Sequence, residues 1–178
     1  MLLEVIVAAI IVGLIAGGSL PRLNDLELRG SGLIFIALAA QLGLPVIGRL
    51  SREAVPAVLV TSFVLLLVAL LVNKKTVPIV AMATGIFLNF AVIAANSGMP
   101  VKAEALPAAA ADLVHIPISE ATRLPWLGDI IIWPLPGAFN GLVSLGDLFL
   151  SAGVFMLIYD GMMYKGKRRK RRVRKGNA

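Results

Sequence analysis

Two carboxylates in the last third of the chain are the residues best suited to chemistry. Asp129 and Asp147 each end a Leu-Gly-Asp triplet, and the residues between them are mostly apolar. An ionised side chain inside hydrocarbon is costly unless it faces a partner or a wet cavity, so such a carboxylate is a functional candidate. Two carboxyl groups within about 6 Å would share a proton and could activate water, as aspartic dyads do. We therefore predict a candidate catalytic or substrate-binding site at Asp129 and Asp147.

A second interpretation of Asp147 needs no reaction. The stretch SLGD at 144–147 is typical of a helix amino terminus, with Ser144 as the N-cap and Asp147 at the third helical position. There the carboxylate can accept from the cap amide and stabilise the positive end of the helix dipole. Ion or proton handling is a third interpretation, and the sequence leaves all three open.

The elements that must position these carboxylates are membrane helices. Of the 178 residues, 58% are hydrophobic, and the mean hydropathy of +0.90 is far above that of soluble domains. Once several segments cross a bilayer, little chain remains for a separate soluble core. We therefore predict a single polytopic domain.

Metal and thiol chemistry are not indicated. The chain has no cysteine, which excludes disulfides, thiol nucleophiles and thiolate metal sites. The single histidine, His115, is expected to be a solvated or locally bonded loop residue, because nothing near it supplies the further ligands that a metal site requires. We predict no metal site and no cofactor.

The apolar runs predict an all-α, polytopic transmembrane helical bundle of five spans. The spans cover residues 2–17, 32–48, 54–72, 77–95 and 142–160. The third and fourth spans should form a hairpin, because only residues 73–76 connect them. Residues 97–141 contain many proline and glycine residues and form a long outer loop, which should pack on the mouth of the bundle with Trp126 and Trp133 at the interface.

Three amides within or just beyond the spans are candidate substrate- or lipid-facing groups. Gln41 lies in the second span, where an amide commonly bonds a neighbouring helix. Asn89 and Asn96 are seven residues apart and therefore share nearly one face of the fourth helix. We expect that face to point into the bundle.

Charge predicts the orientation in the membrane. With five spans, thirteen of the 17 basic residues fall on one side, in the loops 18–31 and 73–76 and in the tail 165–178, and four fall on the other side. The positive-inside rule then places the amino terminus and the long loop outside and the carboxyl terminus in the cytoplasm. This orientation makes any site at Asp129 and Asp147 outer-facing.

The carboxyl-terminal tail is expected to be disordered and to lie on the membrane surface. Nine basic residues lie within Lys165–Lys175. Such a run repels itself in solution and adheres to anionic lipid at about 1 kcal/mol for each nearby charge. We therefore predict the lipid bilayer and anionic lipid as partners, with no nucleic acid, and the sequence does not indicate a protein partner.

Four stretches carry a resemblance that covers nearly the whole chain. They are LRGSGLIFIALAAQLG at 28–43, LNFAVIAANSGMPV at 88–101, LGDIIIWPLP at 127–136 and VSLGDLFLSAGVFMLI at 143–158. This layout resembles an uncharacterised family of bacterial five-helix membrane proteins, domain of unknown function 5317. The resemblance implies an inner-membrane protein of the predicted fold, and it implies no activity.

The two LGD triplets, at 127–129 and 145–147, also resemble the end of prolipoprotein signal peptidases, which are intramembrane aspartyl peptidases. That resemblance implies Asp129 as the first catalytic carboxylate and Asp147 as the second. The GNxxDR block of the peptidases has no counterpart before Asp129, and the Asn140 that would match their FNxAD motif precedes Asp147 by seven residues.

Three functions therefore stay open, and so does the question of whether the protein is an enzyme. The first is an integral inner-membrane protein of unassigned activity with a candidate outer-facing site. The second is an intramembrane aspartyl peptidase, and the third is a small transporter or membrane scaffold. The separation of the two carboxyl groups and the presence of a groove that reaches them would distinguish these alternatives.

Overall fold

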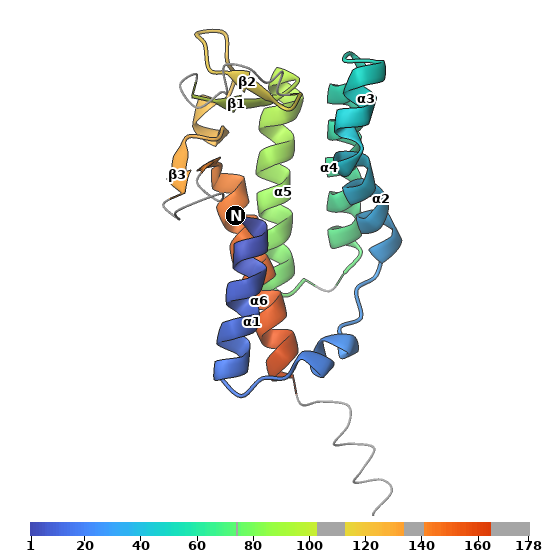
Figure 1. Ribbon diagram of the computed structural model, residues 1–178, viewed down its shortest axis with the longest axis vertical. Helices are drawn as coiled ribbons and strands as arrows, with labels where there is room; N and C mark the ends of the chain where they lie inside the picture. The colour runs from blue at the N-terminus through green and yellow to red at the C-terminus, as the bar shows by residue number, and fades with distance from the viewer. Residues whose placement is uncertain (74, 103–112, 134–140, 165–178) are drawn as a thin grey trace, which may run out of the picture.

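The computed structural model describes residues 1–73, 75–102, 113–133 and 141–164, and most of these are helical (Figure 1). The helices are α1 (Leu2–Ile15), α2 (Ser31–Leu42), α3 (Leu44–Leu50), α4 (Ala54–Leu71), α5 (Val77–Asn96) and α6 (Leu145–Met163). Two short 3₁₀ turns, η1 (Leu20–Asp25) and η3 (Pro125–Leu127), lie between them. The tail 165–178 that we expect to be disordered lies outside the described residues.

Two small sheets accompany the helices, so the predicted all-α class omits part of the fold. Strands β1 (Met99–Val101) and β2 (His115–Pro117) pair in parallel, and β3 (Ile131–Trp133) and β4 (Gly141–Val143) pair antiparallel. Each strand has three residues, too few for the alternation of polar and apolar positions to reveal it in the sequence. Strands β1, β2 and β3 lie within the predicted loop 97–141, toward one end of the bundle (Figure 1). Strand β4 occupies the start of the predicted fifth span, so α6 begins at Leu145 and not at residue 142.

Within the part of the chain that the structure describes, three helices are long and apolar enough to cross a membrane, namely α4, α5 and α6. Helices α2 and α3 meet the same criteria only as a pair, bent by 52° at their junction. Pro45 lies at this bend, in the first turn of α3. Proline supplies no amide hydrogen and disfavours a helical conformation in the residue before it, so it accounts for the break. Helix α1 has 14 residues, about 21 Å of helix against about 30 Å of hydrocarbon.

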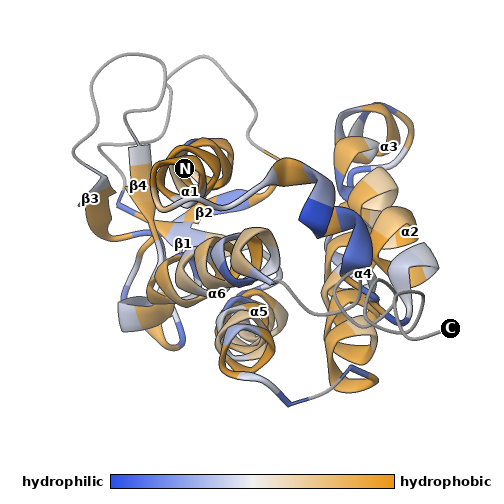
Figure 2. Cartoon of the chain, turned by 90° about the horizontal axis from the view of Figure 1, so that it is seen from below, coloured by the Kyte–Doolittle hydropathy of each residue, from blue (hydrophilic) through white to orange (hydrophobic). Residues whose placement is uncertain are grey.

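The helices form two packed groups. Figure 2 shows α4 beside α2 and α3, and it shows α6 beside α1 and α5. The turn η1 also contacts α6, and α4 contacts α5 and so joins the two groups. Most residues of the helices are hydrophobic, as expected for helices that face lipid (Figure 2). The core near the loop end consists of buried apolar side chains from both groups: Leu44, Val55, Leu59, Val92, Ile93, Met99 and Leu127.

Helices α5 and α6 approach closely at glycine residues. A side chain at Gly85 would collide with the backbone carbonyl of Gly146, and a side chain at Gly146 would collide with Asn89. Small residues at a crossing let two membrane helices pack backbone to backbone. This contact fixes the start of α6 against the middle of α5.

The other end of the bundle is held by bonds to the backbone. Asn73 accepts from the amide of Arg29 and donates to its carbonyl, both at 2.8 Å. Arg22 donates to the carbonyl of Met162, also at 2.8 Å. The predicted loop 18–31 and the described residues of the loop 73–76 therefore lie toward the end of the bundle where α6 finishes (Figure 1).

Candidate functional site

The antiparallel hairpin of β3 and β4 brings the two aspartate-bearing segments together. Asp129 lies two residues before β3, and Asp147 lies four residues after β4. Ile131 pairs with Val143 and Trp133 with Gly141, so the chain returns along itself. Residues 134–140, which connect the two strands, lie outside the described residues.

Asp147 forms the predicted capping box. The hydroxyl of Ser144 accepts from the amide of Asp147 at 2.9 Å, and the amide of Ser144 donates to Asp147 Oδ2 at 3.2 Å. Asp147 also has a partner on another helix, because Asn89 Nδ2 donates to its Oδ1 at 2.8 Å. Both carboxylate oxygens therefore accept hydrogen bonds, and capping is only one of the two roles that the side chain performs.

Asn89 joins α5 to the start of α6 through side chains alone. Its residue is 5% exposed, and its Oδ1 accepts from the hydroxyl of Ser144 at 2.8 Å while its Nδ2 donates to Asp147. Ser144 is completely buried. A buried amide that lost these partners would carry an unsatisfied polar group, which costs about 1–3 kcal/mol. The Asn89 side chain lies directly against Gly146, where an added side chain would collide with it.

Asp129 is held by the first sheet. Its amide donates to the carbonyl of Pro100 at 2.8 Å, which attaches it to β1. The preceding Gly128 is required there, because a side chain would collide with the same carbonyl. Strand β1 pairs with β2 so that Met99 lies opposite His115. The sheet therefore carries Asp129 and His115 at one end of the bundle.

His115 and Asp129 contact each other directly. The distance from His115 Nε2 to Asp129 Oδ2 is 3.1 Å, and the side chains are 33% and 10% exposed. The contact is an ion pair when the imidazole is protonated and a hydrogen bond when it is neutral. From the sequence we expect a solvated or locally bonded loop histidine, and this expectation does not include His115 in the site with Asp129. The parallel pairing of two three-residue strands, which aligns them, has no local sequence signal.

Both aspartates line one pocket of about 290 Å³. Its polar lining consists of Gln41, Asn89, His115, Asp129 and Asp147, and its apolar lining consists of Leu44, Leu59, Phe63, Ile93, Met99 and Val114. These residues come from α2 to α6 and from both strands of the parallel sheet or the residues beside them. Four of the five residues that we singled out from the sequence therefore meet at one cavity.

The other amides have interhelical or loop partners. Gln41 donates to the hydroxyl of Ser62 at 2.9 Å, so it also makes the helix-to-helix bond that is common for such a residue. Asn96 is not part of the pocket lining; its side chain accepts from the amide of Arg123 and donates to its carbonyl, both at 2.8 Å. Asn96 thus fixes the loop to the end of α5.

The polar part of the pocket lining is acidic and amide-rich. Its polar atoms are carboxylate, amide and imidazole groups, and the lining contains no lysine or arginine. When His115 is protonated it balances Asp129, and Asp147 then contributes the remaining formal negative charge of the lining. Among the residues described by the structure, no group of three or more histidine, aspartate or glutamate side chains could hold a metal ion.

Sequence comparison gives the family of the chain without an activity. A family described as a family of unknown function (DUF5317) matches residues 25–159, about three quarters of the chain and all of the pocket lining. No curated protein and no solved structure shows significant similarity to this chain. The chain therefore belongs to the family of unknown function DUF5317.

Proposed function

We propose that this protein is a five-span membrane protein that binds an amphipathic molecule with a cationic or hydrogen-bond-donating head. In this proposal α1 and the bent pair α2–α3 are the first and second spans, and α4, α5 and α6 are the others. Their apolar composition supports membrane insertion. The basic residues favour the bacterial inner membrane with the amino terminus outside, so a reporter fused after Ala178 should be active only in the cytoplasm.

The observation that carries the proposal is the division of the pocket lining. Carboxylates and amides supply acceptors on one part of the wall, and aliphatic and aromatic side chains supply the rest. A volume of about 290 Å³ is at the lower end of the range for small-molecule pockets. The head of the ligand would therefore lie against Asp147 and Asp129, and a short apolar part would lie against Leu59, Phe63 and Ile93.

Three probes that differ only in their head group test the proposal. We would measure binding of hexylammonium, hexanol and hexanoate to the protein in neutral detergent by calorimetry. Hexylammonium should bind most tightly, because a single charge contact in a partly screened site changes affinity about tenfold. Equal binding of all three probes, or preference for hexanoate, would contradict the proposal.

Asp147→Asn is the informative variant in this assay, because it removes the charge and keeps an oxygen that can accept from Asn89. It should abolish the preference for hexylammonium over hexanol. Asp160→Asn is the matched control, since Asp160 lies on the same helix and is exposed far from the pocket. Asp160→Asn should leave the preference unchanged.

Intramembrane aspartyl peptidase activity is the second candidate, supported by the placement of both aspartates on one pocket. In that reaction the pair would activate a water molecule against a peptide carbonyl while sharing one proton. Asp129→Asn and Asp147→Asn should then each abolish cleavage of membrane-inserted peptides by the reconstituted protein. Probe binding without any cleavage by the unaltered protein would instead favour a transporter or scaffold.

A further inference from the structure

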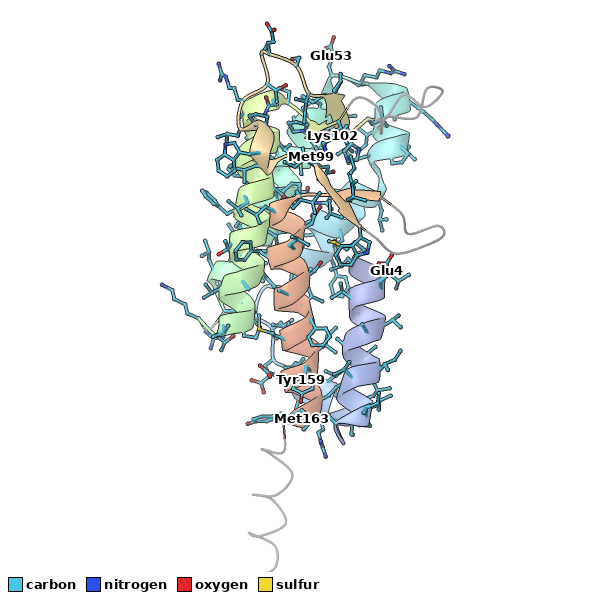
Figure 3. The ribbon with its side chains drawn as sticks, turned by 90° about the vertical axis from the view of Figure 1, so that its left-hand side faces the viewer. Glu4, Glu53, Met99, Lys102, Tyr159 and Met163 are labelled. Atoms are coloured by element: carbon cyan, nitrogen blue, oxygen red, sulfur yellow. The ribbon has the colours of Figure 1, made fainter. Side chains whose placement is uncertain are left out.

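One polar contact joins the first helix to the hairpin that carries the aspartates. The indole of Trp133 donates to Glu4 Oε2 at 2.7 Å. The Glu4 side chain is only 13% exposed, and its other oxygen lies 3.4 Å from the amino group of Met1. Hydrogen bonds to an ionised acceptor are shorter and stronger than neutral ones. Glu4 lies at the end of α1 nearest the strands, as Figure 3 shows.

The hairpin depends on such an external contact. Strands β3 and β4 have three residues each, and a two-stranded hairpin is at best marginally stable on its own. Trp133 is the last residue of β3 and lies four residues after Asp129. Its strand partner Gly141 lies six residues before Asp147. Trp133 and its strand partner are therefore each separated from a carboxylate by only a few residues of chain.

Helix α1 is a fixed support for this contact. A side chain at Gly13 would collide with Met162 of α6, and the amide of Ser19 donates to the carbonyl of Met162 at 3.1 Å. The helix is thus seated on α6 at the end far from Glu4. It precedes residues 25–159, so this support lies outside the matched family region.

We infer that Glu4 is a positioning residue for the pocket: through Trp133 it anchors the β3–β4 hairpin, and the anchored hairpin holds Asp129 in a fixed position relative to Asp147. Glu4 does not touch the ligand. The inference rests on the proposed function only where ligand binding is measured.

Hydrogen exchange tests the anchor without any ligand. In Trp133→Phe and in Glu4→Leu, the amides of residues 131–133 and 141–143 should exchange on the order of tenfold faster, because the hairpin loses one strong hydrogen bond. Glu4→Gln keeps a neutral acceptor for the indole, so its exchange should lie between that of the unaltered protein and that of Glu4→Leu. Trp126→Phe is the control, since Trp126 is 59% exposed on η3. Unchanged exchange in both Trp133→Phe and Glu4→Leu would overturn the inference.

The two effects should not add. Because Trp133→Phe and Glu4→Leu remove the same hydrogen bond, the double variant should exchange no faster than either single variant. Trp133→Phe also leaves the contact between Glu4 and the amino group of Met1 intact, so it isolates the anchor from that second contact. Additive effects on exchange would show that the two residues act independently, and they would contradict the inference.

A cysteine probe separates positioning from simple stability. The chain has no cysteine, so Val114→Cys in the pocket wall would be the sole thiol. Its labelling should be faster in the Trp133→Phe background, and unchanged labelling would overturn the inference.

Hexylammonium affinity should fall in Trp133→Phe and persist in Glu4→Gln, and an unchanged affinity in Trp133→Phe would also overturn the inference. If the unaltered protein does not bind hexylammonium, the proposed function fails, and exchange and labelling alone decide the inference.

Discussion

Three asparagines, Asn73, Asn89 and Asn96, show that this protein uses the same side chain in two different ways. Asn73, at the end where α6 finishes, bonds the backbone of Arg29 and of Ala69. Asn89, toward the loop end, bonds the side chains of Asp147 and Ser144. Side chains that bond the backbone fix the path of the chain. Side chains that bond one another beside a pocket present their chemistry to a ligand.

Asn96 sharpens this comparison because it lies at the loop end and yet behaves like Asn73. It bonds the backbone of Val92 and Arg123 and takes no part in the pocket lining. Position at the loop end therefore does not by itself indicate function. What distinguishes Asn89 is its side-chain partners and its place on the pocket wall.

The largest effect is expected where the two helices behind the pocket touch. Gly146→Val would force its side chain into Asn89 and the carbonyl of Gly85. We expect a loss of about 3 kcal/mol or more in unfolding free energy, because backbone atoms cannot move aside as side chains do. Thermal unfolding in detergent would measure it. Gly32→Val is the control, because nothing lies within 4 Å of the added atom, and equal losses would show that the α5–α6 contact is not special.

Asn89→Ala should produce the next largest effect and should separate the two kinds of asparagine. The change removes partners from Asp147 and Ser144, so the unfolding free energy should fall by about 2 kcal/mol, and hexylammonium binding should weaken as well. Asn73→Ala should cost about 1 kcal/mol and leave binding unchanged. If both variants lose binding equally, the distinction between backbone-bonded and side-chain-bonded asparagines is wrong.

Ser144→Ala should have a smaller effect, confined to stability. It removes the cap acceptor for the Asp147 amide and the donor to Asn89. Loss of an N-cap costs about 1 kcal/mol. Because the carboxylate remains, the preference for hexylammonium over hexanol should persist, as calorimetry would show. A loss of that preference would mean that the cap, rather than the charge of Asp147, defines the site.

Removal of the tail, residues 165–178, should leave both the unfolding free energy and hexylammonium binding unchanged. A peptide of residues 165–178 should bind anionic vesicles and lose that binding as salt rises, because exposed charges are screened. Vesicle sedimentation would measure it. Equal binding to neutral vesicles would remove the electrostatic account of this end of the chain.

Local patterns were sufficient for part of this structure. The apolar runs predict α4, α5 and α6, and the SLGD stretch predicts the capping box that the structure contains. Polar residues in apolar helices are rare enough to be noticed, so Gln41 and Asn89 could be named before their place on the pocket was known. The break between α2 and α3 was missed although Gly43 and Pro45 are visible in the sequence.

The remaining features depend on contacts between distant residues. His115 meets Asp129 because β1 and β2 align in parallel, and Trp133 meets Glu4 across 129 positions of the chain. Neither pair has a spacing or periodicity that would predict it, because the path of the loop determines both. The spacing of Asn89 and Asn96 predicts a common helix face and cannot distinguish a pocket residue from a loop anchor.

The charge preference of the pocket is the most direct test of the central claim, that Asp147 and Asp129 recognise a cationic head. We would label Val114→Cys with a cationic and with an anionic methanethiosulfonate. Each labelling rate would be divided by the rate of the same reagent with free cysteine. We predict a ratio of about five or more in favour of the cationic reagent, because one nearby charge changes a local concentration by roughly this factor. The ratio should approach one in the Asp147→Asn background and stay unchanged with Asp160→Asn. A ratio of one in the unaltered background, with no response to Asp147→Asn, would contradict the account.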